Sequence, residues 1–371
     1  MDEPLVTMTV CVRNGVHWID ECLTALHAQT YRPLEIIVVN DGSTDEAKMT
    51  LDSWHDPEGQ RGIPTRVHHQ EALGLSAGRQ WALEHARGSW VAITDIDVRP
   101  EPDWIRIMME QRHPVEEGER VVAVTGRTIF ERAEDLVSRV RSVEIATKYR
   151  SRPRRTSLAN GPCSVFERAA LLGVGGFDPA WYHAEDMEVS LKLIQAGGTI
   201  VYAPEALVRH VPETGVRRFL GKRRRDARAH LRIVRFYSRR QRLNAGFDFI
   251  GSSAMVLTIF PLWLMFFSTG IPFLVHFVTT QPTEMATIET WWQTQWLIIS
   301  IILLMVHEFI LWGGPLGVVN RGVLKATKHK RVRSIFGVRR LTLLWSIALW
   351  QGLMLGLLDM LLGKNGHRSR K

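Results

Sequence analysis

Short apolar runs alternate with amphipathic stretches over the first two thirds of the chain. Residues 7–12, 34–39 and 90–94 are runs of apolar and β-branched side chains, which predict buried strands. Residues 18–27 and 75–85 lie between these runs and carry apolar side chains at helical spacing. Because the predicted strands and helices alternate, the pattern predicts an α/β fold with a mainly parallel central sheet.

Long apolar stretches replace this alternation in the last third of the chain. Residues 249–277 are almost free of charge, residues 296–311 form the centre of a second stretch, and residues 341–362 form a third. About 20 apolar residues suffice to cross the hydrocarbon core of a bilayer, so these stretches predict C-terminal transmembrane helices. Buried core helices of a soluble protein are the alternative, which the succession of three such stretches disfavours.

These patterns divide the chain into three parts. Residues 1–215 are expected to form the α/β domain, and residues 216–246 a basic juxtamembrane segment at the membrane interface. Residues 247–371 are expected to form a transmembrane region with about three hydrophobic helices.

Basic residues are concentrated beside the apolar stretches, within a formal net charge of +9. They crowd into residues 217–242 and 325–340, whereas residues 279–295 carry two glutamates and no Lys or Arg. Basic segments tend to stay on the cytoplasmic side, so we expect a multi-pass cell-membrane protein whose α/β domain faces the cytoplasm. No nucleic-acid-binding motif accompanies the charge, so membrane lipid, and no nucleic acid, is the expected partner.

The third apolar stretch conflicts with this topology. A third crossing would place Lys364, Arg368, Arg370 and Lys371 outside, against the positive-inside rule. Either the rule is overridden, or the stretch lies in the interface or re-enters. Three crossings are the preferred interpretation from the sequence.

The cysteines and the N-terminus point to a reducing compartment. Cys11, Cys22 and Cys163 show no metal-binding spacing, and their odd number argues against a disulfide framework. Buried packing is therefore their expected role. The first ten residues lack the basic and apolar regions of a signal peptide.

Aspartates follow two of the predicted strands, where ligands of open α/β sheets bind. Asp95 and Asp97 follow the strand at residues 90–94, and such a carboxylate pair can hold a hard cation that also contacts a diphosphate. A solvated turn is the common alternative for two aspartates at this spacing. Asp41 follows the strand at residues 34–39 and could accept hydrogen bonds from a base or sugar, or could simply stabilise a turn.

Three further residues have two possible roles each. Arg79 is interpreted as a nucleotide contact or as a surface helix arginine. Glu185 and Asp186 precede a predicted helix. A carboxylate in that position could act as a general base or as an N-cap.

The remaining candidates are a histidine and a basic segment. His210 comes after a predicted strand at residues 199–202, and it could bind a metal or phosphate, or be structural. The basic residues 151–155 contain a proline. They could form a mobile active-site loop or, equally, an ordinary surface loop.

The order of these motifs resembles the large family 2 of inverting glycosyltransferases with the GT-A fold, over about residues 5–210. Residues 38–45 (VVNDGSTD) are similar to that family's VVDDGSTD, and residues 74–80 (GLSAGRQ) to its G-x-x-x-A-R-N. Asp95 and Asp97 resemble its DxD, residues 175–178 with Glu185 and Asp186 its GGFD…ED, and His210 ends a segment similar to its PeA…H. Each motif is weak alone, but five in this order are specific.

The resemblance implies a GT-A (nucleotide-diphospho-sugar transferase) domain and a role for each residue. Asp41, Arg79 and Asp95 would bind the nucleotide of a UDP- or GDP-sugar donor. Asp97, with His210, would ligate a divalent metal, Mg²⁺ or Mn²⁺. Asp186 would deprotonate the acceptor hydroxyl, with Glu185 as the second candidate.

One departure from the family bears on the product. Processive polysaccharide synthases carry a Q-x-x-R-W motif, and the corresponding residues 217–225 (RRFLGKRRR) lack it. We therefore expect transfer of a single sugar to a lipid-linked or other membrane-associated acceptor, with inversion. A processive synthase and a non-catalytic nucleotide-sugar-binding membrane protein are the alternatives.

Overall fold

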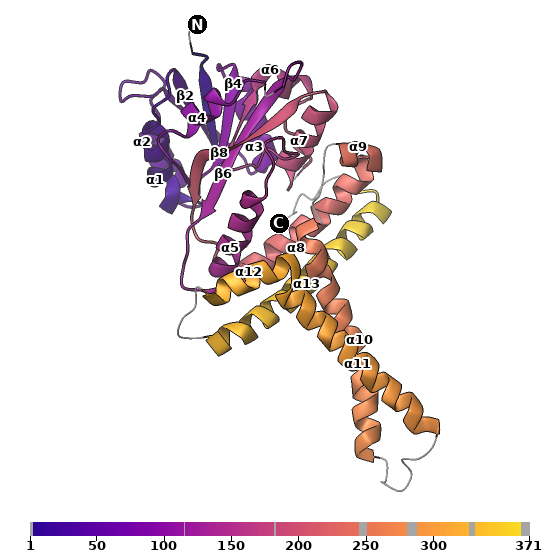
Figure 1. Cartoon of the computed structure of the whole chain (residues 1–371). Coiled ribbons are helices and arrows are strands. Elements are labelled where there is room, and N and C mark those ends of the chain that lie inside the picture. Colours follow the sequence, from indigo (N-terminus) through magenta and orange to yellow (C-terminus); the bar gives the residue numbers. More distant parts are fainter. Residues whose placement is uncertain are drawn as a thin grey trace.

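The computed structural model describes residues 3–114, 116–181, 183–244, 251–279, 288–325 and 331–364. Its N-terminal part is an α/β domain built on an eight-stranded sheet of order β3-β2-β1-β4-β7-β6-β8-β5 (Figure 1). The strands are β1 (Val6–Val12), β2 (Leu34–Asp41), β3 (Thr65–Gln70), β4 (Trp90–Asp95), β5 (Val98–Pro100), β6 (Val121–Phe130), β7 (Ser164–Glu167) and β8 (Thr199–His210). The half formed by β3, β2, β1 and β4 is parallel, whereas β7 and β5 are antiparallel to their neighbours. The predicted mainly parallel sheet is confirmed.

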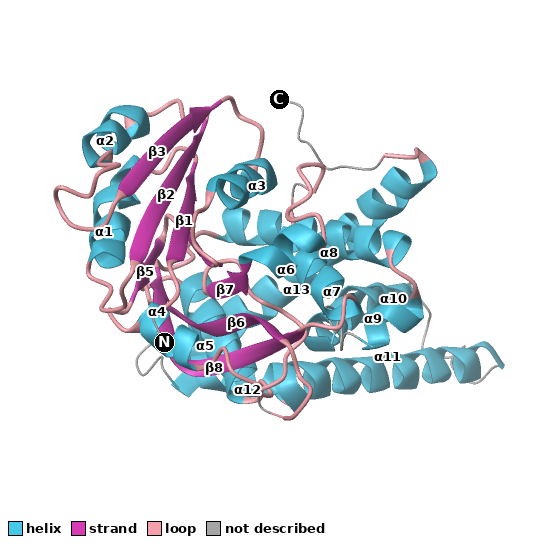
Figure 2. Cartoon of the chain, turned by 90° about the horizontal axis from the view of Figure 1, so that it is seen from above, coloured by secondary structure: helices cyan, strands magenta, loops and turns pink. Residues whose placement is uncertain are grey.

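Helices cover both faces of this sheet (Figure 2). They are α1 (Val16–His27), α2 (Ala47–Trp54), α3 (Leu75–His85), α4 (Trp104–Glu110), α5 (Leu136–Arg150), α6 (Arg168–Gly173) and α7 (Glu185–Gln195). The buried side chains of β2 alternate between two cores: Ile36 and Val38 pack with α1, α2 and α4, whereas Ile37 and Val39 pack with α3, α6 and α7. The unbroken apolar run at β2 follows from this burial on both faces.

The C-terminal third is helical. Its helices are α8 (Val216–Phe236), α9 (Arg239–Asn244), α10 (Gly251–Thr279), α11 (Ile288–Trp312), α12 (Gly314–Lys325) and α13 (Arg331–Leu361). Within the described residues, three helices are long and apolar enough to cross a membrane, namely α10, α11 and α13. The prediction of hydrophobic helices after the α/β domain is therefore confirmed.

These three helices are not placed alike. Helices α10 and α11 form a hairpin that projects away from the α/β domain, whereas α12 and α13 lie between the hairpin and the domain (Figure 1). Only 17% of the apolar span is buried in α10 and in α11, compared with 44% in α13. A separate core joins α13 to α5 and α8, with Val140, Phe219 and Trp345 among its buried members.

Helix α13 runs parallel to the basic helix α8. The ring centroids of Phe219 and Trp345 are 5.3 Å apart near the start of the contact. Further along, a Cβ at Gly352 would lie 2.8 Å from the Cβ of Ala227, so a glycine is needed for this close approach. At the far end, Arg228 donates two hydrogen bonds to Asp359, at 2.6 and 2.7 Å.

Most predicted elements are present with boundaries shifted by a few residues. One prediction is wrong in detail: the strand expected at residues 199–202 does not end before His210, because β8 continues to His210 itself. Parts of the predicted outer loop (residues 280–287) and of the basic C-terminus (residues 365–371) lie outside the described residues. The cysteines are free thiols, with Cys22 and Cys163 buried and Cys11 partly buried.

Candidate active site

The predicted strand-end aspartates lie along one edge of the sheet. Asp41 is the last residue of β2 and Asp95 the last of β4, and both strands are parallel to the β1 strand between them. Asp97 lies in the turn from β4 to β5. The carboxyl ends of parallel strands meet at one edge, so all three carboxylates border the same side of the domain.

Asp41 is buried and holds the segment that leads into α3. Its Oδ1 accepts hydrogen bonds from the Gln70 side chain at 2.8 Å and from the backbone N–H of Leu73 at 2.8 Å. Its Oδ2 accepts one from the N–H of Gly74 at 2.9 Å. In this structure Asp41 organises a loop, and its contact with a nucleobase stays a prediction.

The residue after Asp41 must be glycine. Gly42 has a φ of +64°, and a Cβ there would lie 2.6 Å from the backbone nitrogen of Ala72. The D-G pair of the VVNDGSTD motif therefore packs the end of β2 directly against the loop that Asp41 holds.

Arg79 links residues that are far apart in the sequence. Its guanidinium is buried and donates to Asp95 at 2.8 Å and to Glu185 at 2.6 Å. Burial alone would lower the pKa of Arg79, but the negative charges of Glu185 and Asp95 outweigh it and raise the pKa. Carboxylates engage both terminal guanidinium nitrogens in this structure, and the nucleotide contact of Arg79 stays a prediction.

The neighbouring acids Glu185 and Asp186 have different surroundings. Glu185 is buried beside Arg79; burial raises the pKa of its carboxyl, and the Arg79 charge opposes that shift. Asp186 is partly exposed and has no ion-pair partner among the described residues. Its Oδ2 accepts from the N–H of Gly161 at 2.9 Å and its Oδ1 from the N–H of Met187 at 2.8 Å. Asp186 is thus the freer of the two carboxylates.

Asp97 and His210 face each other across the antiparallel pair of β5 and β8, in which Val98 lies opposite His210. The Nε2 of His210 lies 3.5 Å from Oδ1 of Asp97, and the guanidinium of Arg218 lies 3.9 Å from Oδ2. The Nδ1 of His210 is 2.8 Å from the carbonyl oxygen of Val211. A carbonyl only accepts, so Nδ1 carries a proton, and Nε2 is the ring nitrogen that faces Asp97.

This pair fits a divalent cation in the chemistry of its donors. Carboxylate oxygens and imidazole nitrogens are both ligands of Mn²⁺, and the other imidazole nitrogen of His210 is fixed by a carbonyl, as is usual for ligating histidines. Within the described part of the chain, no group of three or more His, Cys, Asp or Glu side chains could hold a metal. Further ligands would therefore be groups other than these four kinds of side chain, such as substrate or water oxygens.

Two features of the site were not predicted as such. Gly161, in the segment after the basic residues 151–155, touches both Asp186 and Arg79, and a Cβ there would lie 3.0 Å from the Arg79 guanidinium. His183, just before Glu185, lies 2.6 Å from Asp226 of α8. The Asn-Gly-Pro at residues 160–162 is a turn signal that could have indicated the role of Gly161. No local signal indicates the contact between His183 and Asp226.

The fold has a counterpart among solved structures. The mannosyltransferase PcManGT from Pyrobaculum calidifontis, solved in complex with GDP-Man and Mn²⁺, has the same fold. The superposition of the two structures has a TM-score of 0.53 at 18% sequence identity, and it covers 96% of this chain and 88% of that one. The N-terminal domain has the expected GT-A fold.

The family follows from the sequence comparisons. Residues 7–173 match the model described as Glycosyl transferase family 2. The resemblance to glycosyltransferase family 2 that the motifs predicted is therefore confirmed over these residues.

Curated relatives match only part of their own length. The putative glycosyltransferase EpsH of Bacillus subtilis is 37% identical over 29% of this chain and 30% of that protein. The pre-mycofactocin glycosyltransferase of Mycobacterium tuberculosis is 28% identical over 59% of this chain and 45% of that protein. The chain thus spans less than half of the length of these two relatives.

Proposed function

We propose that the chain is a membrane-anchored glycosyltransferase that transfers one sugar from a UDP- or GDP-sugar to an acceptor hydroxyl, with inversion. The observation that carries this proposal is the pair of carboxylates at the edge of a family 2 domain. Glu185 forms an ion pair with Arg79, whereas Asp186 is partly exposed and has no ion-pair partner among the described residues. A partly exposed carboxylate held by two backbone N–H groups is oriented and still accessible to an acceptor.

Asp186 acts as the general base in this proposal. As the acceptor oxygen bonds to the anomeric carbon, its proton passes to Asp186, and the bond from that carbon to the diphosphate oxygen breaks with its electron pair. Attack from the side opposite the diphosphate inverts the configuration, and no covalent intermediate with the enzyme forms. Gly161 and Met187 hold the carboxylate in place through their N–H groups.

Asp97 and His210 are the residues that would hold a divalent metal, Mg²⁺ or Mn²⁺. When bound, such an ion supplies positive charge beside the departing nucleoside diphosphate. PcManGT, which shares the fold, was solved with a nucleotide sugar and a divalent metal, GDP-Man and Mn²⁺. Asp41, Arg79 and Asp95 shape the neighbouring part of the sheet edge, where we place the nucleotide.

The acceptor is proposed to be lipid-linked or otherwise membrane-associated, because the catalytic domain packs against α8, the basic helix that precedes the apolar helices. Arg232 of α8 donates to the carbonyl of Ala180 at 3.0 Å and lies 4.0 Å from the ring of Trp181. His183 contacts Asp226 of α8. These contacts hold α8 against residues 180–183, which come shortly before Asp186 in the sequence. The proposed base therefore lies on the side of the domain that we place toward the membrane.

A ligand screen tests the function directly. The full chain in detergent is expected to bind one nucleotide sugar of a UDP- and GDP-sugar panel in the presence of Mg²⁺ or Mn²⁺, and to transfer its sugar to a component of membrane lipid extracts. Binding without transfer to any extract would favour a non-catalytic nucleotide-sugar-binding protein. A product with many added sugars would favour a processive synthase.

We also propose that α10 and α11 are the only described helices that cross the membrane, with the catalytic domain in the cytoplasm. Helix α8 carries nine basic residues, and each charge at the centre of a bilayer costs roughly 3 kcal/mol, so α8 stays outside the hydrocarbon core. The uncharged part of α13 lies between Arg340 and Asp359, and most of it runs along α8. Because α13 packs along α8, we place α13 in the membrane interface. Two crossings are therefore proposed in place of the three favoured from the sequence.

This topology predicts where engineered cysteines react. In a chain whose three native cysteines are replaced, Thr283→Cys is expected to react with a membrane-impermeant maleimide in intact cells, because it lies between the two crossings. Lys364→Cys is expected to react only after permeabilisation, because α13 does not cross and the chain after it stays on the cytoplasmic side. Labelling of both positions in intact cells would establish a third crossing instead.

A further inference from the structure

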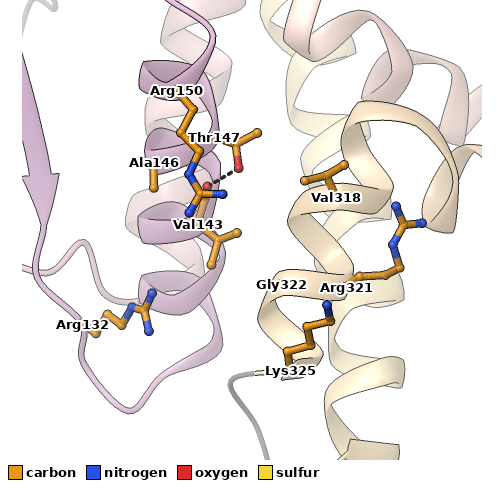
Figure 3. A pocket seen from close by; sticks show the side chains of 9 residues that line it. All are labelled: Arg132, Val143, Ala146, Thr147, Arg150, Val318, Arg321, Gly322 and Lys325. Carbon is orange, nitrogen blue, oxygen red and sulfur yellow. Dashed lines mark hydrogen bonds between the residues drawn. The ribbon is translucent and has the colours of Figure 1, made fainter. Parts of the chain in front are cut away.

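A cavity outside the active site lies between α5 of the catalytic domain and α12 (Figure 3). Its volume is about 410 Å³. It is lined by cationic and small or apolar side chains: Arg132, Val143, Ala146, Thr147, Arg150, Val318, Arg321, Gly322 and Lys325. Four of these nine side chains carry a positive charge and none is acidic, so the cavity has the character of an anion site.

The positive charges are not neutralised by the protein. Arg132, Arg150, Arg321 and Lys325 are all exposed, and none of them has an ion-pair partner among the residues that the structure describes. Arg321 donates a hydrogen bond to the carbonyl of Trp312, which holds the guanidinium in place and leaves its charge unpaired. These four cations differ in this respect from other exposed arginines of the catalytic domain, such as Arg106, which contacts two carboxylates.

The floor of the cavity is apolar. Val143 of α5 lies on the side toward Val318 of α12 (Figure 3), and Ala146 also lines the cavity. The two helices approach closely at Gly322, where a Cβ would lie 2.8 Å from a methyl group of Val143. A rim of cations above an apolar floor complements an amphiphile with a phosphate group, and complements free phosphate less well.

The proposed crossing of α11 would place the cavity near the depth of lipid phosphates. The candidate span of α11 ends at Trp312 and α12 begins at Gly314, so α12 would then lie at the surface of the bilayer. Asn320 of α12 donates to the carbonyl of Leu311 at 2.8 Å, which ties α12 to the end of that span.

One end of the cavity is connected to the proposed base. Arg150 follows Tyr149, whose hydroxyl accepts a hydrogen bond from Asn160 at 3.2 Å. The next residue, Gly161, donates to Asp186. A phosphate held near Arg150 would therefore lie a few residues from the site of transfer.

We propose that this cavity binds the phosphate of a membrane lipid, and that the lipid is the carrier of the sugar acceptor. The second part rests on the proposed function; the first does not. The same phosphate chemistry could come from a bulk anionic lipid, and a comparison of lipid probes separates the two sources.

The test measures lipid binding by the full chain in neutral detergent. The probes are dodecyl phosphate, dioctanoyl phosphatidylglycerol and dioctanoyl phosphatidylcholine. Arg321→Gln with Lys325→Gln is expected to weaken dodecyl phosphate binding at least about tenfold, because two charge-assisted contacts are lost. The matched control, Arg87→Gln with Arg120→Gln, removes two exposed charges just before β4 and β6 and is expected to bind like the parent.

The outcomes distinguish the sources and the proposals. Tighter binding of dodecyl phosphate than of phosphatidylglycerol supports the acceptor carrier, and equal binding supports a bulk anionic lipid. Parent-like binding by the Arg321 and Lys325 variant, or equally tight binding of phosphatidylcholine, overturns the site. Nucleotide-sugar binding, measured on the same samples, is expected to be unchanged in the variant. The lipid measurement therefore tests the cavity proposal, and the nucleotide-sugar measurement tests the transferase proposal independently.

Discussion

Asp186→Asn is expected to slow sugar transfer by about 10²–10⁴-fold at saturating donor, the usual contribution of a general base. The amide keeps the size of the carboxylate and one oxygen, so the N–H group of Gly161 retains an acceptor. It loses the basic oxygen that would receive the acceptor proton. Donor affinity is expected to change little, because the residues proposed to hold the nucleotide and metal are untouched.

The neighbouring acid supplies the matched control. Glu185→Gln is expected to have the milder effect on the rate per folded molecule and the larger effect on stability. Glu185 is one of two partners of a buried arginine, and removing one partner of a buried ion pair typically costs about 3–5 kcal/mol. Transfer rates are compared with donor binding by calorimetry and with thermal unfolding. A parent rate in Asp186→Asn, or a defect only in donor binding, would make Glu185 the leading candidate for the base.

The parallel half of the fold and its edge could be predicted because the signal is local. Strand β2 is buried on both faces, so its apolar run is unbroken, and the polar residues after it mark the carboxyl edge. The same reasoning places Asp41 and Asp95 at strand ends, where the structure has them. Their roles in binding stay predictions, because these roles concern contacts with a bound donor.

The contacts between distant segments could not be predicted. The sequence suggests a nucleotide contact for Arg79, and no pattern near it indicates that Asp95 and Glu185 meet its guanidinium. The third apolar stretch has the length and hydropathy of a transmembrane helix. Its pairing with α8 depends on Gly352 and on the ion pair of Asp359 with a residue of α8 that is distant in the sequence. Length and hydropathy show that a helix could cross a membrane, whereas the segments against which it packs determine its position.

Asp97→Ala is expected to abolish measurable transfer, a loss of roughly 10³-fold or more, because a bound cation contributes several kcal/mol to stabilising the developing charge. The chain should remain folded. Asp97 lies in a turn, and its contacts with His210 and Arg218, at 3.5 and 3.9 Å, are longer than good hydrogen bonds. Removing them therefore costs little of the stability of the domain.

Asp97→Asn and His210→Asn separate a metal ligand from a structural ion pair. A ligand role predicts that either variant weakens Mn²⁺ binding, measured by calorimetry with nucleotide present, and that added Mn²⁺ partly restores transfer. A purely structural pair predicts lowered thermal stability with unchanged metal affinity. Chelation of the parent is expected to reproduce the activity loss of Asp97→Ala and to be reversed by Mg²⁺ or Mn²⁺. Undiminished transfer by Asp97→Ala after exhaustive chelation would exclude this metal site, because the reaction would then proceed with neither the ligand nor the ion.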